Sequence, residues 1–256
     1  MKHIDLNCDM GELPAAIADG TQEALLPSFT SANIACGGHA GDSNTMQTTI
    51  EQALRHHVAI GAHPGYPDPA NFGRLELQLS PAEVSAFVFA QVRAVAEIAS
   101  RCGAHLVHVK PHGALYNQAA HNRQLAAAIA AGVAQWSRKL VLVGLAGSLM
   151  LEVFREAGFT AAAEAFADRR YEPDGTLRSR KFGDALLRDP TEAARQALGI
   201  VERGTVTASN GADIPVHAQT LCIHGDTPGA PQIAATVART LREAGVTPKA
   251  LAHPQN

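Results

Sequence analysis

The chain has 256 residues, of which 46% are hydrophobic and 18% charged, with a formal net charge of -3. This length fits one large α/β domain or two small ones, and the apolar content is ample for a full core. There is no basic patch with interleaved aromatic residues, which argues against a nucleic-acid partner. No apolar run approaches the roughly 20 residues that span a bilayer, which argues against a membrane partner.

The first residues, MKHIDLNCD, have the pattern of a strand, which predicts that no signal peptide precedes the fold. The four cysteines (Cys8, Cys36, Cys102 and Cys222) are scattered, with no C-x-x-C spacing. This distribution favours reduced thiols over a disulfide framework or a zinc-thiolate site. Both features predict a cytoplasmic protein.

The hydrophobic pattern predicts strands alternating with helices along the whole chain. The expected strands are 3–8, 31–36, 58–62, 105–110, 140–144, 161–166 and 220–224. The expected helices are 43–57, 81–102, 121–137, 147–158, 190–202 and 229–245. Ser80-Pro81 with Glu83 is typical of a helix start, and Asp189 opens a later helix in a similar way. Asn210-Gly211, between two β-like runs, predicts a hairpin.

Strands that alternate with helices predict a parallel sheet, which either a closed barrel or an open doubly wound sheet would satisfy. Polar residues follow at least five strands, and no G-x-G-x-x-G follows the first strand, so the barrel is favoured. We therefore predict that residues 1–256 form a single domain, a seven-stranded parallel β/α barrel. Its site is expected at the C-terminal ends of the strands.

Strand one carries Asp5, Asn7 and Asp9 on one face, because strand residues alternate sides. In a barrel this face points into the lumen. Two carboxylates at this spacing raise each other's pKa or bind a cation. The alternative is a solvated loop after a short strand.

Strand four ends in HLVHVKPHGALYN (105–117), where Lys110 and His112 share one face and Tyr116 follows. A buried lysine beside a carboxylate can be an ion pair, an electrophile or a base. The structural alternative is a Lys–Asp pair that plugs the barrel.

His39 follows a Gly-Gly turn after strand two, and His63 ends strand three. With Asp9 they can form a metal site of two histidines and one carboxylate. His63 alone is more typical of a core histidine with a hydrogen-bond partner, and no H-E-x-x-H signature supports the metal.

Arg74 and Arg169 lie in segments that follow strands, where arginine suits a carboxylate or phosphate ligand. The last strand ends in His224-Gly225-Asp226, which places a possible base beside a possible acid. The sequence contains no P-loop and no G-x-S-x-G nucleophile elbow.

Several of these segments together resemble the LamB/YcsF family, whose members are identified as the A subunit of the bacterial 5-oxoprolinase complex. The matching stretches are DLNCDMGE (5–12), SANIACGGHAGD (31–42), GAHPGYPD (61–68), HVKPHGALYN (108–117), EAFADRRY (164–171) and IHGD (223–226). One departure is Leu75, where the family usually has a second arginine after Arg74. The resemblance implies a seven-stranded barrel related to glycoside hydrolases and deacetylases. It also implies ATP-dependent opening of the 5-oxo-L-proline lactam to L-glutamate, together with partner subunits B and C.

The residue patterns and the resemblance together predict a set of site residues. The expected catalytic residues are Asp5, Lys110, His112 and Asp226, with Asp5 or Asp226 as the partner of Lys110 and His112. The expected substrate-binding residues are Asn7, Asn33, Arg74, Tyr116 and Arg169, with Arg74 or Arg169 on the substrate carboxylate. The possible ligands of a divalent metal are Asp9, His39 and His63. ATP is expected as a cosubstrate bound mainly by a partner subunit. The competing predictions are a metal-dependent carbohydrate deacetylase and a non-catalytic lactam-binding subunit.

Overall fold

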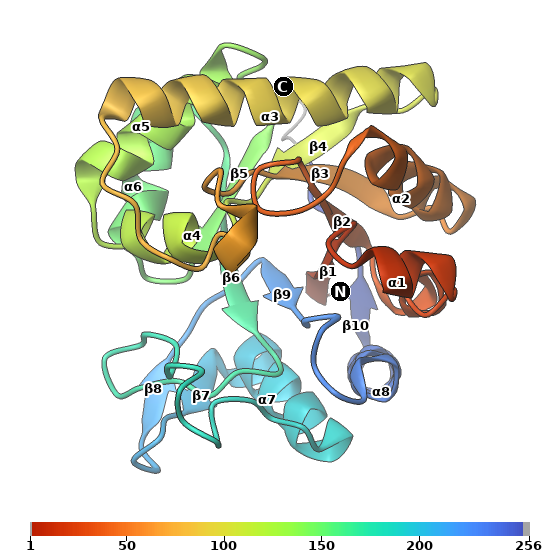
Figure 1. Ribbon diagram of the computed structural model, residues 1–256. Coiled ribbons are helices and arrows are strands. Elements are labelled where there is room, and N and C mark those ends of the chain that lie inside the picture. Colours follow the sequence, from red (N-terminus) through yellow and green to blue (C-terminus); the bar gives the residue numbers. More distant parts are fainter. Residues whose placement is uncertain (1, 253–256) are drawn as a thin grey trace.

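Seven parallel strands form a closed barrel in the computed structural model, which describes residues 2–252 (Figure 1). Neighbouring strands pair in the order β1-β2-β3-β4-β5-β6-β9, and β9 pairs back with β1. The barrel strands are β1 (Lys2–Met10), β2 (Ser31–Ala35), β3 (Ala59–His63), β4 (Leu106–Val109), β5 (Val141–Leu145), β6 (Ala161–Phe166) and β9 (Thr220–Cys222). The predicted seven-stranded β/α barrel is therefore confirmed.

Helices surround the strands on the outside of the barrel (Figure 1). They are α1 (Pro14–Ala18), α2 (Ser43–Arg55), α3 (Pro81–Arg101), α4 (Gly113–Ala119), α5 (Arg123–Ala134), α6 (Leu149–Glu156), α7 (Pro190–Arg203) and α8 (Ala230–Glu243), with the 3-10 turns η1 (Glu23–Ser28) and η2 (Pro69–Asn71). The predicted start of α3 is confirmed, because Ser80 and Glu83 each accept a hydrogen bond from the other's backbone N–H. Asp189 caps α7 as expected. Among the described residues, no helix combines the length and apolar character needed to cross a membrane.

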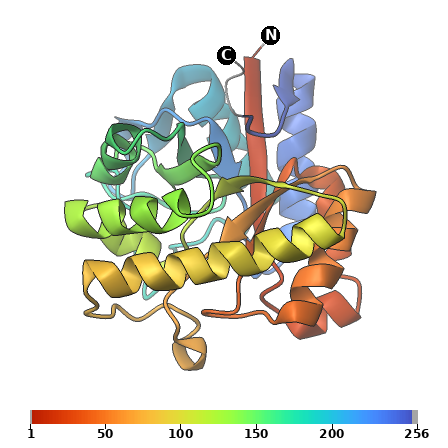
Figure 2. The ribbon, with the colours of Figure 1, turned by 90° about the horizontal axis from the view of Figure 1, so that it is seen from above.

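The segment 204–219 folds as predicted into an antiparallel hairpin of β7 (Thr205–Thr207) and β8 (Asp213–Pro215). Helix α1 and the turns η1 and η2 were not predicted from the sequence, and two further elements differ from the prediction. Helix α4 begins directly after strand four, in a stretch expected to be a turn, and Asn122 caps a separate α5. A three-residue strand, β10 (Val246–Pro248), adds to the N-terminal half of β1 beside α8 (Figure 2).

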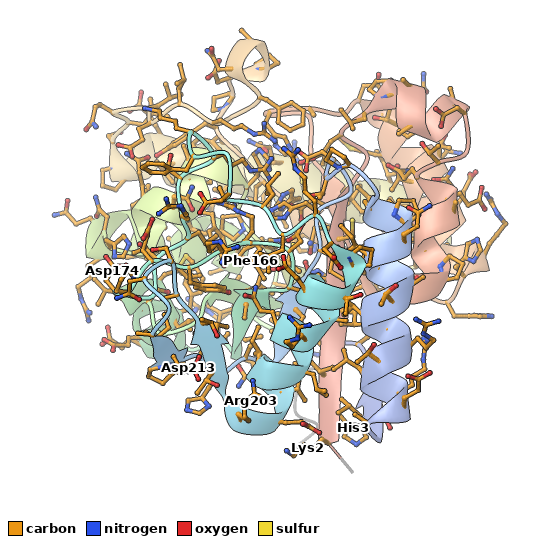
Figure 3. All side chains as sticks on the ribbon, turned by 90° about the horizontal axis from the view of Figure 1, so that it is seen from below. Lys2, His3, Phe166, Asp174, Arg203 and Asp213 are labelled. Carbon is orange, nitrogen blue, oxygen red and sulfur yellow. The ribbon has the colours of Figure 1, made fainter. Side chains whose placement is uncertain are left out.

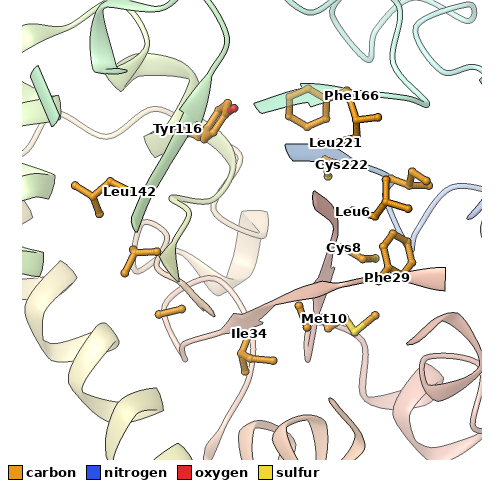
Figure 4. Packing of buried hydrophobic residues seen from close by; sticks show 14 of the residues in the cluster. Leu6, Cys8, Met10, Phe29, Ile34, Tyr116, Leu142, Phe166, Leu221 and Cys222 are labelled. Carbon is orange, nitrogen blue, oxygen red and sulfur yellow. The ribbon is translucent and has the colours of Figure 1, made fainter. Parts of the chain in front are cut away.

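The alternation of β1 separates an apolar layer from a polar lumen. Leu6 and Cys8 are fully buried in the core, and Figure 4 shows them grouped with Phe29. The intervening Asp5 and Asn7 are also buried, but their partners are polar side chains of the barrel interior. The helices therefore cover the apolar side, and the polar side fills the barrel.

The two ends of the barrel differ in chemistry. Lys2 and His3, at the start of β1, lie beside Arg203 at the end of α7, and Figure 3 shows them far from Phe166 at the end of β6. The C-terminal ends of the strands lead into the segments that carry half of the residues proposed for the site, namely His39, Arg74, Lys110, His112, Arg169 and Asp226.

Gly61 in β3 makes room for the His108 ring inside the lumen. A Cβ atom at position 61 would lie 2.1 Å from His108 Nε2. That ring is held in place, because Nε2 also lies 2.7 Å from Asn33 Oδ1.

We expect Gly61→Ala to lower the free energy of unfolding by about 1–3 kcal/mol or more, because the methyl group overpacks the lumen. Gly183→Ala is the matched control, since nothing lies within 4 Å of a Cβ there. Chemical denaturation of both variants measures the difference. Equal stabilities would contradict the close approach of Gly61 and His108.

Candidate functional site

A polar cavity of about 530 Å³ opens at the C-terminal ends of the barrel strands. This volume lies in the usual range for small-molecule sites, roughly 300–1,000 Å³. The residues proposed from the sequence that line it are Asp9, His63, Arg74, Lys110, His112, Tyr116, Arg169 and Asp226. Four others, Asp5, Asn7, Asn33 and His39, lie behind its wall.

Lys110 forms a buried ion group at the floor of the cavity. Its Nζ lies 2.9 Å from Asp9 Oδ1, 2.9 Å from Glu164 Oε1 and 3.2 Å from Cys222 Sγ. Burial alone would lower the pKa of this ammonium group, but the interactions with Asp9, Cys222 and Glu164 together outweigh burial and raise the pKa well above its usual value. Lys110 is therefore a fixed cation, suited to polarising a carbonyl group and unsuited to acting as a base.

Asn7 and Asn33 orient the groups around Lys110. Asn7 Nδ2 donates to Glu164 Oε1 at 2.9 Å, and Asn33 Nδ2 donates to Asn7 Oδ1 and Asp9 Oδ1 at 2.7 and 2.8 Å. His108 lies beneath them, and burial lowers its pKa to about 3, so the ring is neutral. The two asparagines were expected to bind substrate directly, whereas the structure places them one layer below the cavity.

Asp5 lies deeper still, among three hydroxyl groups. Thr30 and Ser31 donate to its Oδ1 at 2.6 Å each, and Thr220 donates to its Oδ2 at 2.5 Å. Burial raises the pKa of Asp5, and the bonds from Ser31 and Thr220 partly oppose that shift. These contacts join β1 to the starts of β2 and β9. Asp5 therefore has a structural role in the barrel.

We expect Asp5→Ala to lower the free energy of unfolding by about 2–4 kcal/mol, because the buried hydroxyls of Ser31 and Thr220 lose their acceptor. Asp5→Asn is the control, since it keeps the shape and one acceptor oxygen. It should be destabilised less and keep kcat for the folded fraction. A large loss of kcat in a stable Asp5→Asn protein would restore the expected catalytic role.

A cluster of three histidines around Glu12 forms one side of the cavity. Glu12 Oε1 lies 2.9 Å from His39 Nε2, 3.2 Å from His112 Nδ1 and 3.8 Å from His63 Nε2. Burial would raise the pKa of Glu12, but the contacts with His112 and His39 outweigh it and lower the pKa well below its usual value. Burial lowers the pKa of His39 to about 4. This cluster is one of the groups in the described chain that can offer ligands to a metal ion.

The cluster differs from the metal site expected from the sequence. His39 and His63 do come together, but Glu12 and His112 complete the group. Asp9 Oδ2 lies 3.3 Å from His63 Nε2, while its Oδ1 is paired with Lys110.

A second group of possible metal ligands consists of Asp9, Cys222 and His224. The ammonium of Lys110 contacts the first two, so this position already holds a cation.

Asp168 and His224 form a buried acid–histidine pair on another side of the cavity. His224 Nδ1 lies 3.0 and 3.1 Å from the two oxygens of Asp168, which also accepts from Thr227 Oγ1 at 2.9 Å. Burial would raise the pKa of Asp168, but the interactions with His224 and Thr227 together outweigh it and lower the pKa. The His224 ring stacks on the Phe166 ring with 5.4 Å between the ring centroids, which fixes its orientation. His224 also lines the cavity.

Asp226 is engaged by two arginines at the mouth of the cavity. Arg74 and Arg180 each place a nitrogen 3.0 Å from Asp226 Oδ2. Burial would raise the pKa of this carboxyl group, but the interactions with Arg180, His224 and Arg74 together outweigh it and lower the pKa. Asp226 was expected beside Lys110 or His112, whereas its ionic partners among residues 2–252 are these arginines.

Arg169 and Tyr116 have polar atoms without partners on the cavity wall. Arg169 is 8% exposed, and its Nη2 donates to the carbonyl of Arg178 at 2.7 Å. Within the described chain, Arg169 Nε and the Tyr116 hydroxyl are buried and make no hydrogen bond. Burial raises the pKa of Tyr116 well above its usual value, so the hydroxyl is a donor to any ligand beside it.

Three residues of the site, Glu12, Glu164 and Asp168, were not proposed from the sequence. His224 was named there only as a possible base beside Asp226. Glu164 carried a usable signal, because an acidic residue inside an apolar strand, AAAEAF, requires a partner. His224 and Asp168 lie 56 positions apart, and no local pattern links them.

A parallel β/α barrel with charged and titratable groups around a cavity at its strand ends is the arrangement of β/α-barrel enzymes. A model of the LamB/YcsF family matches residues 4–256. The chain belongs to this family, as its motifs indicated.

Similar proteins match along nearly their whole length. The 5-oxoprolinase A subunit of Chloroflexus aggregans is 52% identical over 247 residues, covering 96% of this chain and 98% of that protein. The 5-oxoprolinase A subunit of Methylococcus capsulatus is 49% identical, covering 97% of this chain and 95% of that protein.

Solved structures show the same fold. The lactam utilization protein of Thermus thermophilus has a TM-score of 0.91 and 43% identity, covering 98% of this chain and 100% of that one. A family 4 carbohydrate esterase of Streptomyces lividans has a TM-score of 0.50 and 12% identity, covering 96% of this chain and 91% of that one. The second likeness concerns the fold alone.

Proposed function

We propose that this chain is the lactam-opening subunit of an ATP-dependent 5-oxoprolinase. It binds 5-oxo-L-proline, or its phosphorylated form, in the strand-end cavity and acts with partner subunits B and C to yield L-glutamate. The observation that carries the proposal is one cavity that gathers Arg169, Lys110 and His224. The names of the similar proteins support the choice of substrate.

Arg169 is the proposed anchor for the carboxylate of 5-oxoproline. Its buried Nε lacks a partner in the described chain, whereas Arg74 is already paired with Asp226. A charge-assisted hydrogen bond to a carboxylate satisfies an otherwise unpaired buried donor. This contrast selects Arg169 from the two arginines that the sequence left open.

Lys110 is the proposed electrophile at the lactam carbonyl. Asp9 and Glu164 hold its ammonium in position. The ammonium therefore does not have to move when negative charge develops on the lactam oxygen. His224 is the proposed base for water, oriented by Asp168 as a histidine is oriented in a catalytic triad.

The stability of the lactam explains why its opening would require ATP. A five-membered lactam is a resonance-stabilised amide, and transfer of a phosphoryl group to its oxygen makes the ring carbon a better target for water. ADP leaves in that transfer, water adds to the ring carbon, and the C–N bond breaks as the nitrogen takes up a proton. A second water then cleaves the resulting γ-glutamyl phosphate to L-glutamate and inorganic phosphate. Because the sequence has no P-loop, we assign the binding of ATP to a partner subunit.

Two experiments test the anchor. We expect Arg169→Ala to raise the KM for 5-oxoproline tens-fold or more in the reconstituted complex, since losing such a contact costs on the order of 2–5 kcal/mol. Arg74→Ala is the matched comparison and should change KM far less. A larger effect at Arg74 would transfer the role to that residue, and an unchanged KM at both would refute the assignment.

The acid–histidine pair has its own test. We expect His224→Ala to lower kcat of the folded protein by roughly 10²–10⁴-fold, as for loss of a general base. The melting temperature should also fall, because the buried Asp168 loses its partner, so kcat is expressed per folded protein. Asp168→Asn should lower kcat and alter its pH profile, because the ring loses its orienting charge. His3→Ala, at the opposite end of the barrel, is the control. Full activity of a folded His224→Ala protein would remove His224 from the mechanism.

Glutamate release from 5-oxoproline and ATP, with and without the partner subunits, tests the function as a whole. A carbohydrate deacetylase would instead release acetate from an acetylated sugar without ATP. A non-catalytic lactam-binding subunit would keep the rate of the complex in the His224→Ala variant while binding survives.

A further inference from the structure

The hydrogen bonds of two histidines fix where their protons lie. His63 Nδ1 lies 2.7 Å from the carbonyl oxygen of Lys110, and His112 Nε2 lies 2.9 Å from the carbonyl oxygen of Phe72. A carbonyl oxygen only accepts, so each of these nitrogens carries a hydrogen. In the neutral ring, the other nitrogen of each histidine then presents a lone pair.

These two lone pairs face each other beside a carboxylate. His63 Nε2 and His112 Nδ1 are 3.0 Å apart, and Glu12 Oε1 lies 3.8 and 3.2 Å from them. Three acceptor atoms that converge in this way repel one another unless a cation lies between them.

The spacing of the three atoms suits a transition metal. Ligand atoms bound tetrahedrally at about 2.0–2.1 Å are about 3.3 Å from one another. The three separations, 3.0, 3.2 and 3.8 Å, bracket that value. Histidines bound to metals usually donate their second N–H to a carbonyl or carboxylate, as His63 and His112 do.

His39 has a different role in the cluster. Its ring stacks on His112 at 3.6 Å with only 3° between the planes. Lone pairs lie in the ring plane, so two parallel stacked rings cannot both direct a lone pair at one ion. Instead, His39 Nε2 lies 2.9 Å from Glu12 Oε1 and can donate to it. His39 is therefore a positioning residue for Glu12.

We infer that Glu12, His63 and His112 form a site for one divalent transition-metal ion of the zinc type. All three residues line the cavity, and His39 lies behind them. Imidazole with carboxylate suits zinc, whereas magnesium and calcium prefer oxygen ligands alone. Three protein ligands leave a coordination position open toward the cavity.

The surrounding backbone is shaped for this cluster. A Cβ at Gly65 would lie 2.7 Å from His39 Nδ1, and a Cβ at Gly73 would lie 2.8 Å from His39 Cβ and 3.1 Å from His112 Cδ2. The loop that carries Phe72 can therefore close over the rings only because these positions lack side chains.

The test is metal binding by the whole chain, which does not depend on lactam turnover. The protein is stripped with a chelator, loaded separately with Co²⁺ and Zn²⁺, and dialysed. Elemental analysis and the visible spectrum of the Co²⁺ form are then measured. We expect one ion per chain and the absorption of a low-symmetry nitrogen and oxygen site.

Variants assign the ligands. Glu12→Gln, His63→Ala and His112→Ala should each abolish stoichiometric binding, while His39→Ala should weaken it roughly 10–100-fold, as for residues that orient ligands. His121→Ala, another histidine on the cavity wall, is the matched control and should keep the full content. Circular dichroism checks that each variant is folded.

Several results would overturn the inference. One is a wild-type chain that retains neither ion, which would mean that a proton shared by His63 and His112 takes the place of the metal. Another is a folded Glu12→Gln or His112→Ala variant that binds as tightly as the wild type. A third is a His39→Ala variant that loses the ion completely while His63→Ala retains it.

Discussion

The ion group of Lys110 with Asp9 and Glu164 is the constraint on which the rest of the site depends. It joins β1, β4 and β6 across the barrel, so three strands meet at one charge. A buried ammonium is stable only with such partners, and removing one of them typically costs about 3–5 kcal/mol. The cation is therefore both the central polar contact of the barrel and a charge displayed at the floor of the cavity.

The polar lumen explains why the surrounding groups have the identities they do. Each inward side chain must find a partner in the interior, and the chain from His108 through Asn33 and Asn7 supplies partners as far as Lys110. Below this chain, Asp5 gathers hydroxyl groups instead of charges. The ion group of Lys110 thus lies at the floor of the cavity, where a ligand can reach it, and hydrogen bonds from hydroxyl groups fill the barrel below it.

The sequence predicted the barrel and the inward face of its strands, because alternation with period two is a local property. That is why Asp9 and Lys110 could be placed on one shared surface before their contact was known. Partners were harder to predict. Glu12 follows the end of β1, and only the path of the loop brings it to the histidines.

Contacts between residues that are far apart in the sequence also explain the other differences between the predicted and the observed site. Asp168 and His224 come from the ends of β6 and β9, so their pairing depends on the closure of the barrel. Arg74 and Arg169 looked equivalent in the sequence, since both follow strands. Only the three-dimensional contacts separate an arginine already paired with Asp226 from one whose Nε has no partner in the described chain.

Asp226 also has a consequence for entry to the cavity. One carboxylate oxygen receives both Arg74, which follows η2, and Arg180, from the long segment between β6 and α7. Two separate loops are thus fastened at a single point on the rim. Both arginines are substantially exposed, so dissolved salt screens these pairs far more than it screens the buried group around Lys110. A rise in ionic strength therefore weakens the ion pairs of Asp226 at the mouth of the cavity and leaves the buried ion group of Lys110 nearly unchanged.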